Sequence, residues 1–152
     1  MKTTLIVCDI QPEYSGWFTF SAQDFANFLN RVTYDKIIYF FNGYETTGAD
    51  FLTVESLKAW LLDYGVKQTK IDKIEFIDKG CGFALEAIDT QPIAEVLTQI
   101  QNGKIWNVSY DSIKNQESIM FIGGSVDACL LELIVGAKAF NVPYDLNEKW
   151  IF

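Results

Sequence analysis

The chain has 152 residues, none of them histidine, and a formal net charge of −8 from 12 Lys+Arg against 20 Asp+Glu. A hydrophobic fraction of 49% argues against disorder, and no apolar run reaches the roughly 18 residues that a membrane span needs. Without histidine the chain has no imidazole base and no histidine metal ligand, so any chemistry has to use carboxylates, lysine, cysteine or hydroxyl groups.

The charge and the cysteine content limit which binding partners and which cellular compartment we expect for the protein. Binding of nucleic acid needs clustered Lys and Arg, yet Arg31 is the only arginine. The three cysteines form no C-x-x-C pair, which argues against a disulfide framework and against a zinc site. The sequence also turns acidic at Asp9, too early for a secretory signal peptide. We therefore expect a cytoplasmic protein with reduced thiols and a single domain over residues 1–152.

The first half of the chain alternates predicted strands with predicted helices. Residues 5–8 and 37–41 are unbroken apolar runs, which are typical of strands buried on both faces of a parallel sheet. Ser21 begins a capping-box-like sequence before an apolar stripe at helical spacing, and Thr53 precedes a second such stripe. The partly alternating residues 74–77 suit a strand at the edge of the sheet.

The second half continues the alternation. Pro92 fits the first turn of a third helix, and no element is assigned to residues 104–116. Residues 119–122 form another unbroken apolar run and predict a buried strand. Residues 127–140 are apolar almost all round and predict a largely buried helix, after which the mixed residues 144–152 suit a fifth strand.

This order of elements predicts an α/β protein with three layers, a Rossmann-like sandwich around a mostly parallel sheet of five or six strands. In such folds ligands bind beyond the carboxyl ends of the strands. The residues directly after the predicted strands are therefore the candidates for a site: Asp9, Asn42, Lys79 and residues 123–129.

Cys129 is the most informative of these candidates. It begins the predicted buried helix, where backbone N–H groups and the helix dipole lower a thiol pKa and supply donors for an oxyanion. Packing as a small apolar residue is the alternative interpretation. Cys8 lies inside a strand and suits core packing, while Cys81, in a loop between two glycines, is the competing nucleophile.

Asp9 and Lys79 each allow two interpretations. Asp9 serves either as a general base at the mouth of the crevice or as a cap for the following turn. Lys79 either keeps a carboxylate or thiolate ionised or is an ordinary solvated lysine. The glycines at residues 123–124 with Ser125 leave open a phosphate cradle, although no established phosphate-binding motif is present.

Two motifs point to a known family. Residues 5–13, Leu-Ile-Val-Cys-Asp-Ile-Gln-Pro-Glu, read as an apolar strand that ends in Asp before a small turn. Residues 119–129, Ile-Met-Phe-Ile-Gly-Gly-Ser-Val-Asp-Ala-Cys, read as a strand, a glycine turn and a cysteine that opens an apolar helix. With Lys79 between them, the order Asp, Lys, Cys resembles that of the isochorismatase-like cysteine hydrolases.

The resemblance implies a role for each residue. Cys129 would attack a carbonyl carbon, Asp9 would take and return its proton, and Lys79 would orient both. A cis peptide bond would join Ser125 to Val126, and the N–H groups of Val126 and Cys129 would form the oxyanion hole. The family's nicotinamidase branch binds its metal through Asp and His, so a chain without histidine implies no metal and no cofactor.

Aromatic residues near the predicted site suggest a substrate pocket. Tyr14 and Trp17 follow Asp9, and Phe83 follows Lys79. Such side chains can form an apolar wall that stacks on a flat substrate. Packing over the sheet or an interface between subunits explains the crowded aromatics after Asp9 equally well.

The sequence therefore supports a cysteine hydrolase that cleaves a small amide or related C–N bond through an acyl-Cys129 intermediate. We expect a small-molecule substrate, no nucleic-acid or membrane partner, and a homo-oligomer. The alternative is an inactive binding or assembly module of the same fold, which Val126, where the family commonly has threonine, and the short chain favour. A third interpretation is a small-ligand or nucleotide-binding protein that uses residues 123–125.

Overall fold

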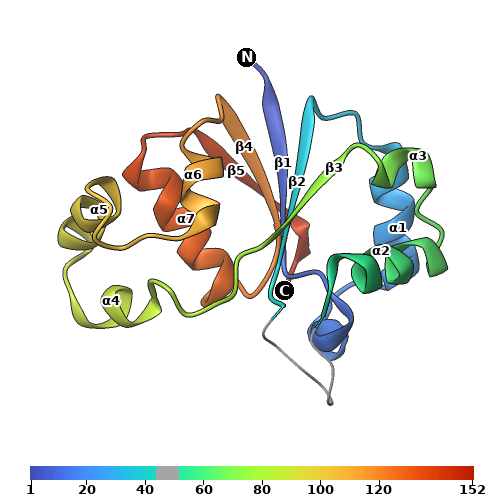
Figure 1. Ribbon diagram of the computed structural model, residues 1–152, viewed down its shortest axis with the longest axis horizontal. Coiled ribbons are helices and arrows are strands. Elements are labelled where there is room, and N and C mark those ends of the chain that lie inside the picture. The colour runs from blue at the N-terminus through green and yellow to red at the C-terminus, as the bar shows by residue number, and fades with distance from the viewer. Residues whose placement is uncertain (44–51) are drawn as a thin grey trace.

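The computed structural model describes residues 1–43 and 52–152 and has a parallel sheet at its centre (Figure 1). The sheet has five strands in the order β3-β2-β1-β4-β5, and every pair of neighbours is parallel. This arrangement confirms the predicted α/β class. In chain order the strands are β1 (Thr3–Cys8), β2 (Lys36–Phe41), β3 (Ile74–Asp78), β4 (Ser118–Gly123) and β5 (Tyr144–Ile151).

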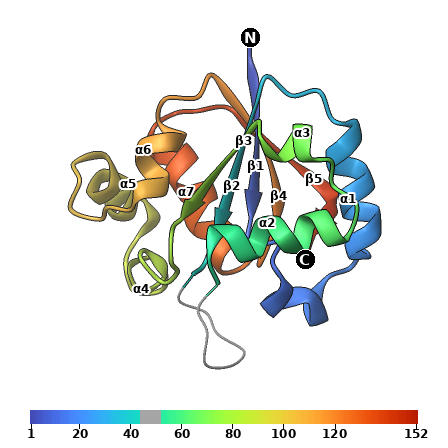
Figure 2. The ribbon, with the colours of Figure 1, turned by 45° about the vertical axis from the view of Figure 1, so that its right-hand side comes forward.

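Helices cover both faces of the sheet, which gives the three predicted layers (Figures 1 and 2). One face carries α1 (Ala22–Arg31), α2 (Val54–Asp63) and α3 (Gln68–Ile71). The other carries α4 (Leu85–Thr90), α5 (Ile93–Gln101), α6 (Val108–Ile113) and α7 (Cys129–Ala139). Among the described residues, no helix has the length and apolar character to cross a membrane.

The unbroken apolar runs are explained by burial on both faces. In β1, Leu5 and Val7 pack into the core beneath α1 and α2, whereas Ile6 and Cys8 pack into the core beneath α5 and α7. Successive side chains of a strand point to opposite faces, so a strand covered twice has no position for an exposed polar residue.

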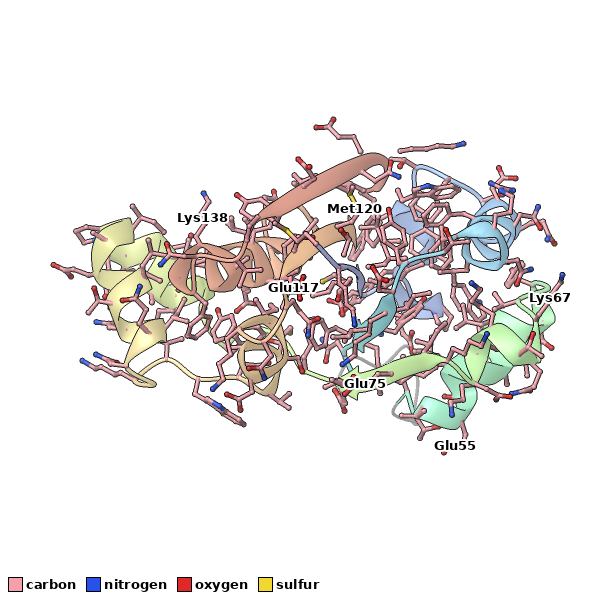
Figure 3. All side chains as sticks on the ribbon, turned by 90° about the horizontal axis from the view of Figure 1, so that it is seen from above. Glu55, Lys67, Glu75, Glu117, Met120 and Lys138 are labelled. Carbon is pink, nitrogen blue, oxygen red and sulfur yellow. The ribbon has the colours of Figure 1, made fainter. Side chains whose placement is uncertain are left out.

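The edge strands carry the mixed sequences. β3 pairs only with β2, and its Glu75 lies in solvent beside Lys36. Figure 3 shows the side chains of Glu55, Lys67, Glu75 and Lys138 on the outside of the fold, over helices and the β3 edge. An edge strand tolerates such polar positions because part of its surface has no helix to cover it.

Two of the predicted helix starts are confirmed, whereas Pro92 is the N-cap of α5 instead of part of its first turn. Ser21 Oγ accepts the Asp24 N–H at 3.0 Å, and Thr53 shares a capping box with Ser56. The structure adds elements that the sequence did not reveal: α6 within the unassigned segment, the short helices α3 and α4, and a 3-10 helix at Pro12–Trp17. Elements of four to six residues are too short to show a helical period.

Candidate active site

Asp9 and Lys79 meet beyond the carboxyl ends of β1 and β3, although β2 lies between these strands. The Asp9 N–H donates to the carbonyl of Phe40, and the Lys79 N–H donates to that of Phe41, each at 3.0 Å. Both backbones are therefore tied to the end of β2. From there Lys79 Nζ reaches across and donates to Asp9 Oδ2 at 3.0 Å. The structure thus brings two of the predicted site residues into direct contact.

This ion pair is buried, with 0% of the Lys79 side chain and 1% of the Asp9 side chain exposed. Burial raises the pKa of Asp9, and the charge of Lys79 limits that rise. Burial would lower the pKa of Lys79, but its anionic neighbours, among them Asp9, outweigh burial and raise it. The site therefore pairs the Lys79 amine with a carboxyl group that is more basic than that of an ordinary aspartate.

Cys129, the third predicted residue, begins α7 beside the same carboxylate. Burial raises the pKa of its thiol, the charge of Asp9 raises it further, and Lys79 opposes both. The predicted lowering of this pKa is therefore wrong. The helix N-terminus favours a thiolate, but partial burial and a carboxylate neighbour favour the neutral thiol more strongly. Cys129 accordingly rests as a thiol next to a base.

One oxygen of the Asp9 carboxylate has no hydrogen-bond donor among the described residues. Lys79 engages Oδ2, whereas Oδ1 is buried and accepts no well-formed hydrogen bond from any described residue. A buried carboxylate oxygen without a donor is costly and rare in native proteins. Proton transfer from the Cys129 thiol, or a hydrogen bond from a bound molecule, would satisfy this oxygen.

Glu132 is a site residue that sequence reasoning missed. It lies one turn after Cys129 in α7, is fully buried, and accepts two backbone N–H groups, from Gly82 at 3.1 Å and from Ala84 at 2.6 Å. Burial raises its pKa, and these two N–H groups oppose the rise. Glu132 thereby ties the loop after Lys79 to the helix that carries Cys129. A lone acidic residue in an otherwise apolar helix was the signal for it.

Polar side chains also fix the backbone around the pair. Asn107, the N-cap of α6, donates from Nδ2 to the carbonyl of Lys79 at 2.8 Å. Buried Gln11 joins the loops after β1 and β2, because its amide donates to the Asn42 carbonyl at 3.1 Å and accepts the Asn42 N–H at 2.8 Å. Asn42 thus bonds to the loop after Asp9 through its backbone.

A cavity of about 130 Å³ opens beside Asp9 and Cys129. Its aromatic walls are Tyr14, Trp17 and Phe152. The small residues Gly124, Ser125 and Ala128 complete the lining. A larger hollow of about 400 Å³ lies among Thr3 and residues 31–35, and none of the candidate site residues lines it. The smaller cavity is therefore the candidate active site, because Asp9 and Cys129 line it.

Two of the predicted pocket residues, Tyr14 and Trp17, line this cavity, whereas Phe83 does not. Phe83 packs edge-on against Tyr110, with ring centroids 5.4 Å apart, in the core beneath α5 and α7. Because Glu132 holds Gly82 and Ala84 on either side of it, the loop directs Phe83 into that core instead of toward Cys129. The prediction for Phe83 is corrected accordingly.

The turn before Cys129 also differs from its prediction. The cis peptide bond joins Gly124 to Ser125, one bond earlier than predicted. The Val126 N–H donates to the carbonyl of Phe152 at 3.1 Å, so it is not a free donor for an oxyanion hole. Val126 itself is 47% exposed and lies outside the cavity lining, which Ser125 joins.

The N–H of Cys129 makes no hydrogen bond within the described part of the chain, as expected for the first turn of a helix. It is the predicted oxyanion donor that the structure leaves available. A phosphate cradle is less well supported, because Gly124 donates to the Cys8 carbonyl at 3.0 Å and Val126 is also engaged. Within residues 1–43 and 52–152, no cluster of Cys, Asp or Glu is arranged to hold a metal ion.

No protein family model matches the sequence, and no curated protein matches it. A solved structure that is similar to this chain is that of the nicotinamidase SaPncA from Staphylococcus aureus. The two are 18% identical, the likeness covers 96% of this chain and 78% of the other, and the TM-score is 0.42. A likeness of this degree says nothing about a reaction, so function has to follow from the geometry of the site.

Proposed function

We propose that this protein is a cysteine-dependent hydrolase that cleaves a small amide or related C–N bond. The observation that carries the proposal is the buried Asp9 carboxylate, which pairs with Lys79 through Oδ2, keeps Oδ1 without a hydrogen bond among the described residues, and lines the cavity together with Cys129. A nucleophile, a base and a group that orients the base are the parts that covalent catalysis requires.

The first half of the reaction forms an acyl-enzyme. As Sγ of Cys129 bonds to the carbonyl carbon, its proton moves to Asp9, because the raised pKa of the thiol prevents a thiolate from forming beforehand. The N–H of Cys129 is a donor for the negative charge that develops on the carbonyl oxygen. The C–N bond then breaks, the leaving nitrogen takes the proton from Asp9, and a thioester stays on Cys129.

The second half releases the acid. Asp9 takes a proton from water, the water oxygen bonds to the thioester carbon, and the C–S bond breaks as the proton returns to Sγ. The products are a carboxylic acid and an amine or ammonia. Lys79 keeps its charge throughout and holds Asp9 in place, since its Nζ is fixed between Asp9 Oδ2 and the Gly80 carbonyl at 2.9 Å.

The test is release of ammonia from a panel of small primary amides, with intact mass measured during turnover. We expect a subset of the panel to be hydrolysed, an acyl adduct on Cys129, and loss of both in Cys129→Ala. Cys81→Ala is the matched control and should keep full activity, because Cys81 is exposed and lies outside the cavity lining. Activity that survives Cys129→Ala would exclude the mechanism.

A second candidate function has one observation in its favour. The raised pKa of Cys129 also suits a binding module in which the thiol lines the cavity without reacting. Such a protein would bind small molecules beside Asp9, release no ammonia, and show alkylation of Cys129 no faster than that of buried Cys8.

The remaining expectations from the sequence stay predictions. A homo-oligomer would be detected by sedimentation of the purified chain. A cytoplasmic location agrees with three free cysteines, Cys8, Cys81 and Cys129.

A further inference from the structure

The cavity beside Cys129 is small. Its volume is about 130 Å³. Sites for drug-sized ligands enclose roughly 300–1,000 Å³. The space beside the nucleophile is therefore smaller than a site for a drug-sized ligand and suits a small acyl group.

The cavity also lacks a free positive charge within the described part of the chain. Among the described residues of its lining, Asp9 alone has a charged side chain. The nearby cation, Lys79, is buried away from the space and already donates to Asp9 Oδ2 and to the Gly80 carbonyl. A carboxylate on the acyl group would lose its water and gain no cationic partner, and it would also lie beside the negative charge of Asp9. Both the desolvation and the repulsion are unfavourable.

Phe152 forms the inner wall and is held from several sides. Its N–H donates to the Gly123 carbonyl and its carbonyl accepts the Val126 N–H, each at 3.1 Å. Its ring packs on Phe18, with centroids 5.0 Å apart. The ring also covers Gly124 so closely that a Cβ there would lie 2.6 Å from two ring atoms. These contacts hold both the backbone and the ring, so the wall is fixed by the fold.

Trp17 also lines the cavity but is far more exposed than Phe152, so we place it at the outer rim. It is 69% exposed, ends the 3-10 helix Pro12–Trp17, and stacks on Tyr14 with centroids 5.8 Å apart. Removing this ring opens the mouth of the cavity without deepening it. Removal of the Phe152 ring extends the space toward Phe18, on which it packs.

We propose that the site selects a small, uncharged acyl group and that Phe152 sets its upper size limit. The inference rests on the proposed function, because it takes Cys129 as the attacking group. Phe152 is a specificity-determining residue in this account: it takes no part in bond making, and it decides which acyl groups bring their carbonyl carbon within reach of Sγ.

The test uses alkylation of Cys129 in the full chain by three reagents. Iodoacetamide is small and neutral, iodoacetate is small and anionic, and N-phenyliodoacetamide is neutral and bulky. In each reaction Sγ forms a C–S bond, iodide leaves, and the thiol proton is lost. Peptide mass mapping gives the rate at Cys129 relative to exposed Cys81 in the same sample, which cancels the effect of the overall negative charge.

In the unaltered protein we expect the relative rate of alkylation, that at Cys129 divided by that at Cys81, to be at least tenfold higher for iodoacetamide than for either of the other two reagents. Phe152→Ala should raise the relative rate of the bulky reagent at least tenfold more than it changes the relative rate of iodoacetamide. Phe152→Leu, a milder change that retains the packing on Gly124, should give a smaller rise. Trp17→Ala should speed all reagents alike, and Phe83→Leu, outside the cavity, should change none.

The outcomes separate the two proposals. If Cys129 reacts with iodoacetamide but the bulky reagent gains nothing in either Phe152 variant, the size limit is overturned and the proposed function stands. If iodoacetate matches iodoacetamide, the charge selection is overturned. If Cys129 is inert to every reagent while Cys81 reacts, the proposed function fails and the inference falls with it.

Discussion

Replacing Lys79 with methionine tests the buried ion pair directly. Methionine keeps most of the volume of the side chain and removes the charge that faces Asp9 Oδ2 at 3.0 Å. Because both side chains are buried, the carboxylate loses its partner without gaining water. Breaking a buried pair in this way costs about 3–5 kcal/mol of unfolding free energy. We expect a loss of that size at pH 7.5, measured by urea unfolding.

The unfolding free energy that Lys79→Met loses should depend on pH, and the direction of that dependence can be worked out. Without Lys79, burial raises the pKa of Asp9 further, since the lysine charge no longer opposes it. The folded state then binds more protons than the unfolded state, so stability falls as pH rises through the folded pKa of Asp9. The destabilisation by Lys79→Met should therefore shrink between pH 7.5 and pH 5, as Asp9 takes up a proton.

A matched control exists at the surface. Lys36 Nζ lies 3.1 Å from Glu75, nearly the same distance, but the two side chains are 48% and 49% exposed. Solvent screens this pair, and Lys36→Met should cost about 0–1 kcal/mol. Equal effects of the two substitutions, both below about 1 kcal/mol, would refute the account of a buried and desolvated pair.

Three further predictions concern the same site. Since turnover needs ionised Asp9 and burial raises its pKa, the acid limb of the pH–rate profile should lie above the ordinary aspartate range; a limb near pH 4 would contradict this. Glu132→Gln leaves one backbone N–H facing an amide donor and should cost about 1–3 kcal/mol in urea unfolding, with reduced kcat; unchanged values of both would argue against its positioning role. Gly124→Ala forces a Cβ to within 2.6 Å of the Phe152 ring and should cost about 1–3 kcal/mol in thermal unfolding, whereas Gly16→Ala meets nothing within 4 Å and should be neutral.

The fold and the meeting of the candidate residues could be predicted because local signals and one topological rule suffice. Unbroken apolar runs mark strands covered on both faces, and Ser21 and Thr53 mark the starts of helices. Parallel strands end at the same edge, so residues that follow them converge there. That rule alone places Asp9 and Lys79 together.

The parts that were wrong depend on contacts between distant segments. The N–H of Val126 donates to the carbonyl of Phe152, which lies 26 positions further along the chain, and no local sequence pattern predicts that bond. The direction of the Phe83 side chain is set by Glu132 of α7, which binds the backbone N–H groups of the residues on either side of Phe83. The pKa of Cys129 depends on burial and on a carboxylate 120 positions away, which together outweigh the local effect of the helix start.

The most direct test of the account is the rate at which iodoacetamide alkylates Cys129 at pH 7 in the unaltered protein and in Asp9→Asn. Two roles of Asp9 predict opposite results. As a base that takes the thiol proton, its loss should slow alkylation at least tenfold. As a mere negative charge that raises the pKa of Cys129, its loss should speed alkylation. The proposed mechanism predicts slowing, and an equal or faster rate in folded Asp9→Asn would contradict it.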